Sequence, residues 1–180
     1  MISELDVLRI VSERLDAAQI PYMLTGSYAL AFYTTPRMTR DLDLVISLSD
    51  DDVGGIVRVF ESDFYIDADE VRSSVLTQRP FNLMHLKSGI KVDFIIRKSA
   101  EYRQVEFARR KQVNLAGVTT WIATREDLIL SKLVWAKDSA SELQQRDVRS
   151  LINESVDLGY VEQWAKRLGV DALLRKAVHE

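Results

Sequence analysis

The sequence lacks cysteine altogether, which excludes disulfide bonds and zinc–thiolate sites. Histidine is nearly absent too, with only His85 and His179, so neither a transition-metal centre nor a Ser–His nucleophile system has support. The first 20 residues carry charges throughout and hold no apolar signal core, and no later stretch reaches the about 18 apolar residues of a membrane span. We therefore expect a cytoplasmic protein that does not use a membrane.

The charge is small in total but unevenly distributed. Net charge is -3, which argues against a general nucleic-acid coat protein. Residues 1–70 carry 14 acidic and 5 basic side chains, a net of -9, whereas residues 71–150 carry 8 acidic and 15 basic ones, a net of +7. This asymmetry would suit a cleft with metal on one wall and phosphate on the other, although an ordinary solvated surface would also produce it.

The hydrophobic periodicity alternates between strand and helix up to residue 122 and is helical afterwards. The predicted strands span 22–25, 41–46, 64–66, 81–86, 90–96, 112–115 and 119–122, and the predicted C-terminal helices span 124–137, 142–154, 160–168 and 172–180. This order predicts an α+β fold. At 180 residues we expect a single compact unit, in which an α/β core of residues 1–123 is packed against a helical region of residues 124–180.

Three aspartates on two predicted strands are the candidate catalytic residues. In Asp41-Leu42-Asp43 the two carboxylates share one face of the strand, while Leu42 points into the core. Asp93 lies in a similar apolar strand and is forced to the side opposite Val92. Because carboxylates this close repel each other unless a cation lies between them, neighbouring strands would make the three aspartates one site for a hard ion such as Mg²⁺. The alternative is that Asp93 pairs with a nearby lysine or arginine.

A Gly-Ser turn precedes the aspartate pair. Residues 24–30 read as a strand, then Gly26-Ser27, then a short helix. Such a turn presents backbone N–H groups and a hydroxyl at a helix N-terminus, where phosphate binds readily, although Ser27 would also be an ordinary helix cap.

The combination of Gly26-Ser27, Asp41-x-Asp43 and a later strand acid, Asp93, resembles the polymerase-beta-like nucleotidyltransferase superfamily. Within this superfamily, the sequence is most similar to bacterial stand-alone members, among them abortive-infection and toxin–antitoxin nucleotidyltransferases. The motifs that carry this similarity are Gly-Ser-x-Ala-Leu, then Arg-x-Thr-x-Asp-x-Asp and finally Glu-Asp-Leu-Ile-x-x-Lys (126–132). The motifs cover about residues 22–135. The resemblance implies a nucleotidyltransferase-like mixed sheet flanked by helices, with a C-terminal helical tail.

The resemblance also implies an activity and roles for these residues. The activity is transfer of a nucleoside monophosphate from an NTP to a hydroxyl group of an RNA such as tRNA, of a protein or of a small molecule. An antitoxin is a candidate partner protein. Two Mg²⁺ ions would be held by Asp41, Asp43 and Asp93, and the outer phosphates by Gly26 and Ser27.

Further basic residues are candidates for nucleotide binding. Arg37 and Arg40 flank the acids and could neutralise a triphosphate, although Arg40 could instead pair with Asp41 or Asp43. Lys132 could reach a phosphate from an otherwise apolar helix face or could be a surface lysine that extends past its helix.

Two other functions remain open at this stage. The first is a catalytically silent module that keeps the fold and binds a partner protein such as an antitoxin. The second is an aspartate phosphatase with Asp41 as its nucleophile, against which the upstream Gly-Ser turn counts.

Overall fold

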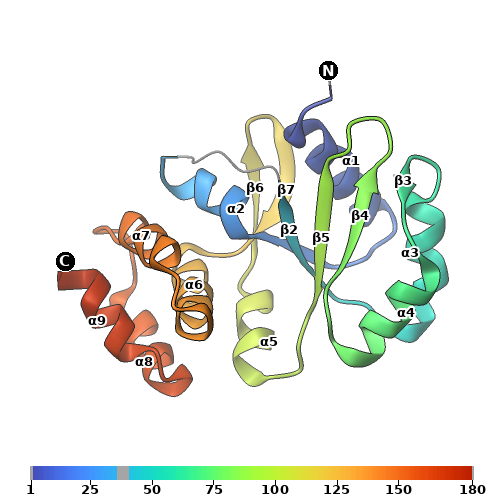
Figure 1. Cartoon of the computed structure of the whole chain (residues 1–180). Helices are drawn as coiled ribbons and strands as arrows, with labels where there is room; N and C mark the ends of the chain where they lie inside the picture. Colours follow the sequence, from blue (N-terminus) through green and yellow to red (C-terminus); the bar gives the residue numbers. More distant parts are fainter. Residues whose placement is uncertain (1, 36–40, 180) are drawn as a thin grey trace.

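The computed structural model describes residues 2–35 and 41–179, and these residues build one mixed β-sheet (Figure 1). The strands are β1 (Tyr22–Thr25), β2 (Leu42–Ile46), β3 (Phe64–Tyr65), β4 (Phe81–His85), β5 (Lys91–Ile96), β6 (Lys111–Leu115) and β7 (Val118–Ile122). Their order in the sheet is β3-β4-β5-β2-β1-β7-β6. The pairs β2–β5 and β1–β7 are parallel and the other neighbours antiparallel, so the predicted α+β fold with a mixed sheet is confirmed.

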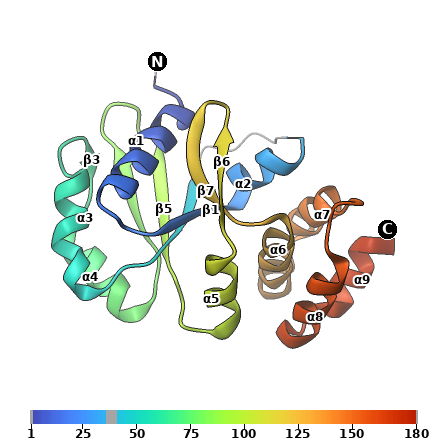
Figure 2. The same cartoon turned by 180° about the vertical axis from the view of Figure 1, so that it is seen from behind.

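Helices cover the sheet and form the C-terminal region. They are α1 (Glu4–Ala17), α2 (Gly26–Tyr33), α3 (Val53–Phe60), α4 (Ala68–Thr77), α5 (Glu101–Ala108), α6 (Arg125–Ser139), α7 (Glu142–Leu151), α8 (Leu158–Leu168) and α9 (Asp171–His179). Figure 2 shows α1 across one face of the sheet, while α6 to α9 gather at one side of it. No helix within the described residues is both long and apolar enough to cross a membrane.

The central strands follow the alternation expected from the sequence. On β2 and β5 every second side chain is buried, and these side chains are Leu42, Leu44, Ile46, Val92, Phe94 and Ile96. They share one hydrophobic core with residues of α1, of α3 and of the C-terminal helices. Burying this face leaves the intervening residues of both strands, including the aspartates, on the opposite face.

Most predicted strand and helix ends differ from the observed ones by one to three residues. The helix predicted over 142–154 stops at Leu151, because Ile152 is already extended and the side chain of Asn153 accepts a hydrogen bond from the backbone N–H of Ser155 at 3.0 Å. The strand predicted from Asp41 begins one residue later, at Leu42, so Asp41 lies just before β2.

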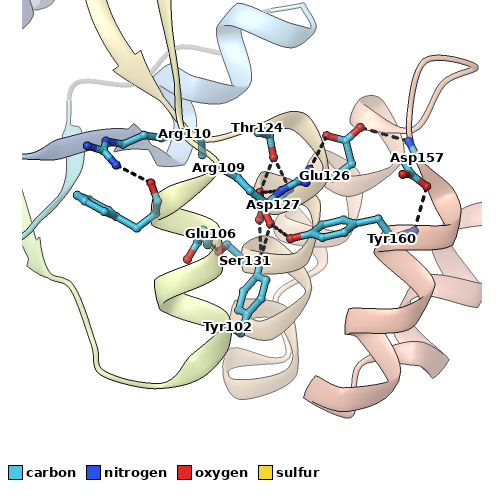
Figure 3. A network of polar contacts seen from close by, with 12 residues as sticks. Tyr102, Glu106, Arg109, Arg110, Thr124, Glu126, Asp127, Ser131, Asp157 and Tyr160 are labelled. Carbon is cyan, nitrogen blue, oxygen red and sulfur yellow. Dashed lines mark hydrogen bonds and ion pairs between the residues drawn. The ribbon is translucent and has the colours of Figure 1, made fainter.

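A buried carboxylate joins the C-terminal helices to the rest of the fold (Figure 3). Asp127 is fully buried and accepts hydrogen bonds from Arg109 at 3.0 Å, Thr124 at 2.6 Å and Tyr160 at 2.7 Å, with Tyr102 at 3.4 Å. These partners come from the two ends of α5, from the start of α6 and from α8. A charge held by so many partners fixes the relative positions of the three helices, since removing Asp127 would leave the Arg109 guanidinium without its shortest ion pair.

Candidate active site

Asp43 and Asp93 lie directly opposite each other on adjacent parallel strands. The register of β2 and β5 pairs Asp43 with Asp93, and both side chains are on the face opposite the buried leucine and valine positions. Asp41 is exposed just before β2 and, with the other two, lines the same cavity. The structure therefore brings together all three aspartates that the sequence singled out.

The carboxylate of Asp43 is electrostatically strained. Burial, together with the charges of Asp93 and Asp41, raises its pKa to about 6, while the charges of Lys132 and Lys91 act in the opposite direction. Because the ionised form of Asp43 is destabilised, binding of a positively charged ligand next to it is favourable.

Asp93 is held in an ion pair on the same face. The Nζ atom of Lys91, two residues earlier on β5, lies 2.9 Å from Oδ2 of Asp93. This pairing with a basic residue is the alternative to a metal site that the sequence left open. Both groups remain partly accessible to solvent, with 40% of the Lys91 side chain and 26% of the Asp93 side chain exposed.

The Gly26 backbone lies against the carboxylate of Asp43. Gly26 has a φ of 64°, in the left-handed region, and a Cβ atom there would lie 2.1 Å from Oδ2 of Asp43. Glycine is thus required twice, for the backbone conformation and for the close approach. Gly26 opens α2, and Ser27 is buried beside it and lines the same cavity. The turn consequently delivers a helix N-terminus to the aspartates.

Lys132 is buried rather than extended past its helix into solvent. It is 4% exposed, and its Nζ atom donates to Oδ2 of Asp147 at 2.7 Å and to Oε1 of Gln144 at 3.1 Å. Both partners lie on α7. The sequence hypothesis of a surface lysine is therefore wrong, and Asp147 and Gln144 are site residues that sequence reasoning did not select. The only signal for them in the sequence is the charged segment 145–149, which contains Asp147.

A cavity of about 650 Å³ connects these groups, a volume within the range of small-molecule sites. Its acidic end is formed by the three aspartates together with Gly26, Ser27 and Lys132. Its other walls include Arg97, Lys98, Arg103, Glu106, Ser131 and Trp135. Six of the eight sequence-selected residues thus line one cavity, and the other two, Arg37 and Arg40, lie outside the described residues.

A second buried carboxylate in the cavity wall was also missed by sequence reasoning. Glu106 of α5 is 3% exposed and receives a hydrogen bond from Arg103 at 2.8 Å and a short one from Ser131 of α6. Burial raises the pKa of Glu106, against the opposing charge of Arg103 and the two hydrogen bonds. The spacing of Arg103 and Glu106 on one helix is compatible with an ion pair, but the burial of Glu106 and its bond to Ser131 depend on the packing of α5 against α6, which the sequence does not show.

The donor chemistry of the acidic end fits a hard divalent cation. Asp41, Asp43 and Asp93 line one cavity and offer only carboxylate oxygens, the ligands that Mg²⁺ prefers. Among residues 2–35 and 41–179, however, no three acidic or histidine side chains converge closely enough to enclose an ion as they stand. The Lys91 ammonium already occupies one side of Asp93.

No protein-family model matches the sequence, and no curated protein matches it. Solved structures do match in fold. An antigenic nucleotidyltransferase-like protein from Paracoccidioides brasiliensis is 20% identical with a TM-score of 0.56, over 96% of this chain and 92% of that one.

Two antibiotic-modifying proteins match at similar levels. The structure of ANT(2")-Ia in complex with adenylyl-2"-tobramycin is 14% identical with a TM-score of 0.60, over 92% of this chain and 96% of that one. The lincomycin-bound lincosamide antibiotic adenylyltransferase LnuA is 12% identical with a TM-score of 0.55, over 83% of this chain and 96% of that one. At these identities the likeness shows that this chain has the nucleotidyltransferase fold.

Proposed function

We propose that this protein is an Mg²⁺-dependent nucleotidyltransferase that transfers a nucleoside monophosphate from an NTP to a hydroxyl group. One observation carries the proposal. The Gly26 backbone approaches the Asp43 carboxylate so closely that no side chain fits, and Asp93 stands opposite Asp43 on the next strand. A helix N-terminus that can hold phosphate is thereby placed beside two carboxylates that can hold a cation.

The reaction would be an in-line displacement at the α-phosphorus. The acceptor oxygen forms a bond to phosphorus, the bond to the pyrophosphate oxygen breaks, and Asp93 takes the hydroxyl proton. Two Mg²⁺ ions held by Asp41, Asp43 and Asp93 would neutralise the charge that develops on the phosphoryl and leaving-group oxygens. Gly26 and Ser27 bind the outer phosphates, so that the protein acts mainly by positioning and by charge complementarity.

Lys132 supplies the cation on the opposite wall. Its charge acts on Asp43, since it lowers the pKa of that carboxyl, and the bonds to Asp147 and Gln144 hold the ammonium in place. Trp135 follows one turn later on α6, lines the same cavity and is 55% exposed, so its indole is available for a nucleobase to stack on. A nucleotide would thus extend along α6 with its phosphates toward the acidic end.

The acceptor class is the finer part of the proposal. Small-molecule hydroxyls are favoured by the adenylylated tobramycin in one structure of the same fold, while an RNA or protein acceptor, in a toxin–antitoxin or phage-defence role, rests on the sequence resemblance to that group. A panel of acceptors separates these possibilities.

The experiment is a transfer assay with each of the four NTPs, labelled at the α-phosphate, in the presence of Mg²⁺. The acceptors are total RNA, cell protein and a set of polyhydroxylated small molecules including aminoglycosides. We expect label to be transferred to one acceptor class and pyrophosphate to be released in equal amount. Asp43→Asn and Asp93→Asn should each lower the rate by at least about 100-fold, whereas Glu154→Gln, an exposed change in the loop after α7, should not.

Isothermal titration with each Mg–NTP provides the second readout. If none of the four nucleotides bound the wild-type protein, and Asp43→Asn behaved like wild type in every assay, the proposed activity would be wrong. A protein that bound nucleotides but modified none of the three acceptor classes would contradict the acceptor range stated above.

A further inference from the structure

The Lys91–Asp93 ion pair lies at the edge of the proposed metal site and has no role in the reaction described above. Both residues are on the open face of β5, two positions apart, with 2.9 Å between Nζ of Lys91 and Oδ2 of Asp93. The ammonium therefore occupies space around a carboxylate that the proposed function assigns to a divalent ion.

Through its partner, Lys91 lies beside the acidic cluster as a whole. Its ammonium contacts Asp93, which stands opposite Asp43 in the parallel register of β5 and β2, and Asp41 lies just before β2. The lysine thus acts as a counter-ion within the cluster, as a bound cation would.

We propose that Lys91 is a built-in counter-cation that competes with a divalent metal ion for Asp93. The inference rests on the proposed function for the identity of the competing ion. A single positive charge relieves only part of the repulsion among three carboxylates, so a divalent ion gains from the same cluster but must first displace the ammonium. In the nucleotide-free protein the position at Asp93 is consequently weak for metal.

Nucleotide binding would change this balance. A triphosphate brings phosphate oxygens, which are good acceptors for a lysine ammonium. When Lys91 turns to a phosphate oxygen, Asp93 becomes free for metal and for the hydroxyl proton. The ion pair then keeps Asp93 occupied until substrate is present.

The test is metal binding to the full chain without nucleotide. Mn²⁺ is titrated into the wild type, Lys91→Met and Lys87→Met, with free Mn²⁺ measured by electron paramagnetic resonance. Lys87 is exposed in the turn of the same β4–β5 hairpin, so its replacement removes the same charge without touching the acids. We expect Lys91→Met to bind Mn²⁺ about tenfold more tightly than wild type, and Lys87→Met to stay within about twofold.

Two additions make the result specific to Asp93. The double variant Lys91→Met/Asp93→Asn should lose the gain in affinity. With saturating α,β-methylene ATP, the difference between wild type and Lys91→Met should shrink to about twofold or less, because the nucleotide itself displaces the lysine. Circular dichroism confirms folding, and Lys91→Gln replaces Lys91→Met if the latter does not fold.

Three results would overturn the inference. They are equal Mn²⁺ affinity in wild type and Lys91→Met, weaker Mn²⁺ binding in the variant, and no Mn²⁺ binding to either protein. Its failure is distinguishable from failure of the proposed function. If transfer of nucleotide occurs but the Mn²⁺ affinities are equal, only the role of Lys91 is wrong, whereas the expected Mn²⁺ pattern without any nucleotide transfer leaves Lys91 as a counter-cation in a site with another chemistry.

Discussion

Replacing Asp43 by asparagine should make the metal-free protein more stable while abolishing its activity. Burial and the neighbouring aspartates raise the pKa of Asp43 from 3.8 to about 6. In the native state this carboxyl therefore keeps its proton up to about pH 6, whereas in the unfolded chain it loses the proton near pH 3.8. Above about pH 6 the native protein bears the full cost of the charge, and the uncharged amide introduced by Asp43→Asn avoids it.

The size of the effect follows from the linkage between protonation and folding. A pKa that is higher in the native state lowers the free energy of unfolding as the pH rises through the interval between the two pKa values. From 3.8 to about 6 this amounts to about 3 kcal/mol at pH 8, and to about 1 kcal/mol at pH 4.5. Asp43→Asn should gain these amounts relative to wild type, so the advantage should shrink as the pH falls.

Urea denaturation followed by circular dichroism at pH 4.5 and pH 8, with EDTA present, measures the effect. Glu154→Gln removes one exposed negative charge and controls for the change in net charge. The reasoning is refuted if Asp43→Asn is no more stable than wild type at pH 8, or if its advantage is as large at pH 4.5. Added Mg²⁺ should stabilise wild type more than the variant, because only the carboxylate binds the ion strongly.

Two further substitutions test the other walls of the site. Gly26→Ala should destabilise the protein by well over the about 1–2 kcal/mol of a left-handed alanine and should remove nucleotide transfer, because its Cβ would collide with Asp43. Gly89→Ala, with a similar φ of 69° and open space around it, separates backbone strain from the collision: similar unfolding free energies for the two variants would contradict the account. Asp147→Ala should cost about 3–5 kcal/mol, since it removes the carboxylate that forms an ion pair with the buried Lys132 ammonium. The same variant should also bind Mg–ATP more weakly, which isothermal titration measures. Wild-type stability and wild-type affinity in this variant would show that Lys132 does not contribute to the site.

Much of the acidic end could be predicted from the sequence, because strand alternation is a local rule. Because Leu42 and Val92 are buried, their neighbours Asp43 and Asp93 must lie on the opposite face of the sheet. The parallel register of the two strands then brings these aspartates opposite each other. The register itself follows from matching the buried positions of the two strands, since a slip of one residue would expose the apolar side chains.

The opposite wall could not be predicted in the same way. Lys132, Asp147 and Glu106 lie on three different helices, and the contacts Lys132–Asp147 and Glu106–Ser131 each join two helices. Their burial depends on how the helices pack against one another. The pairs that result join residues 15 and 25 positions apart, which no periodicity along one helix encodes.

The two kinds of wall draw on both parts of the unevenly charged chain. The acidic first part contributes Asp41 and Asp43, and the basic second part contributes Lys91 and Lys132, the two lysines whose charges act on Asp43. Each lysine is itself held by an aspartate of that basic segment, Lys91 by Asp93 and Lys132 by Asp147. The difference between the pairs is exposure, since Lys132 is fixed in a buried network, whereas Lys91 remains partly accessible to solvent and can exchange its partner. The buried pair thus fixes the Lys132 ammonium in place, and under the proposed function the accessible pair is the position at which an incoming cation and substrate would act.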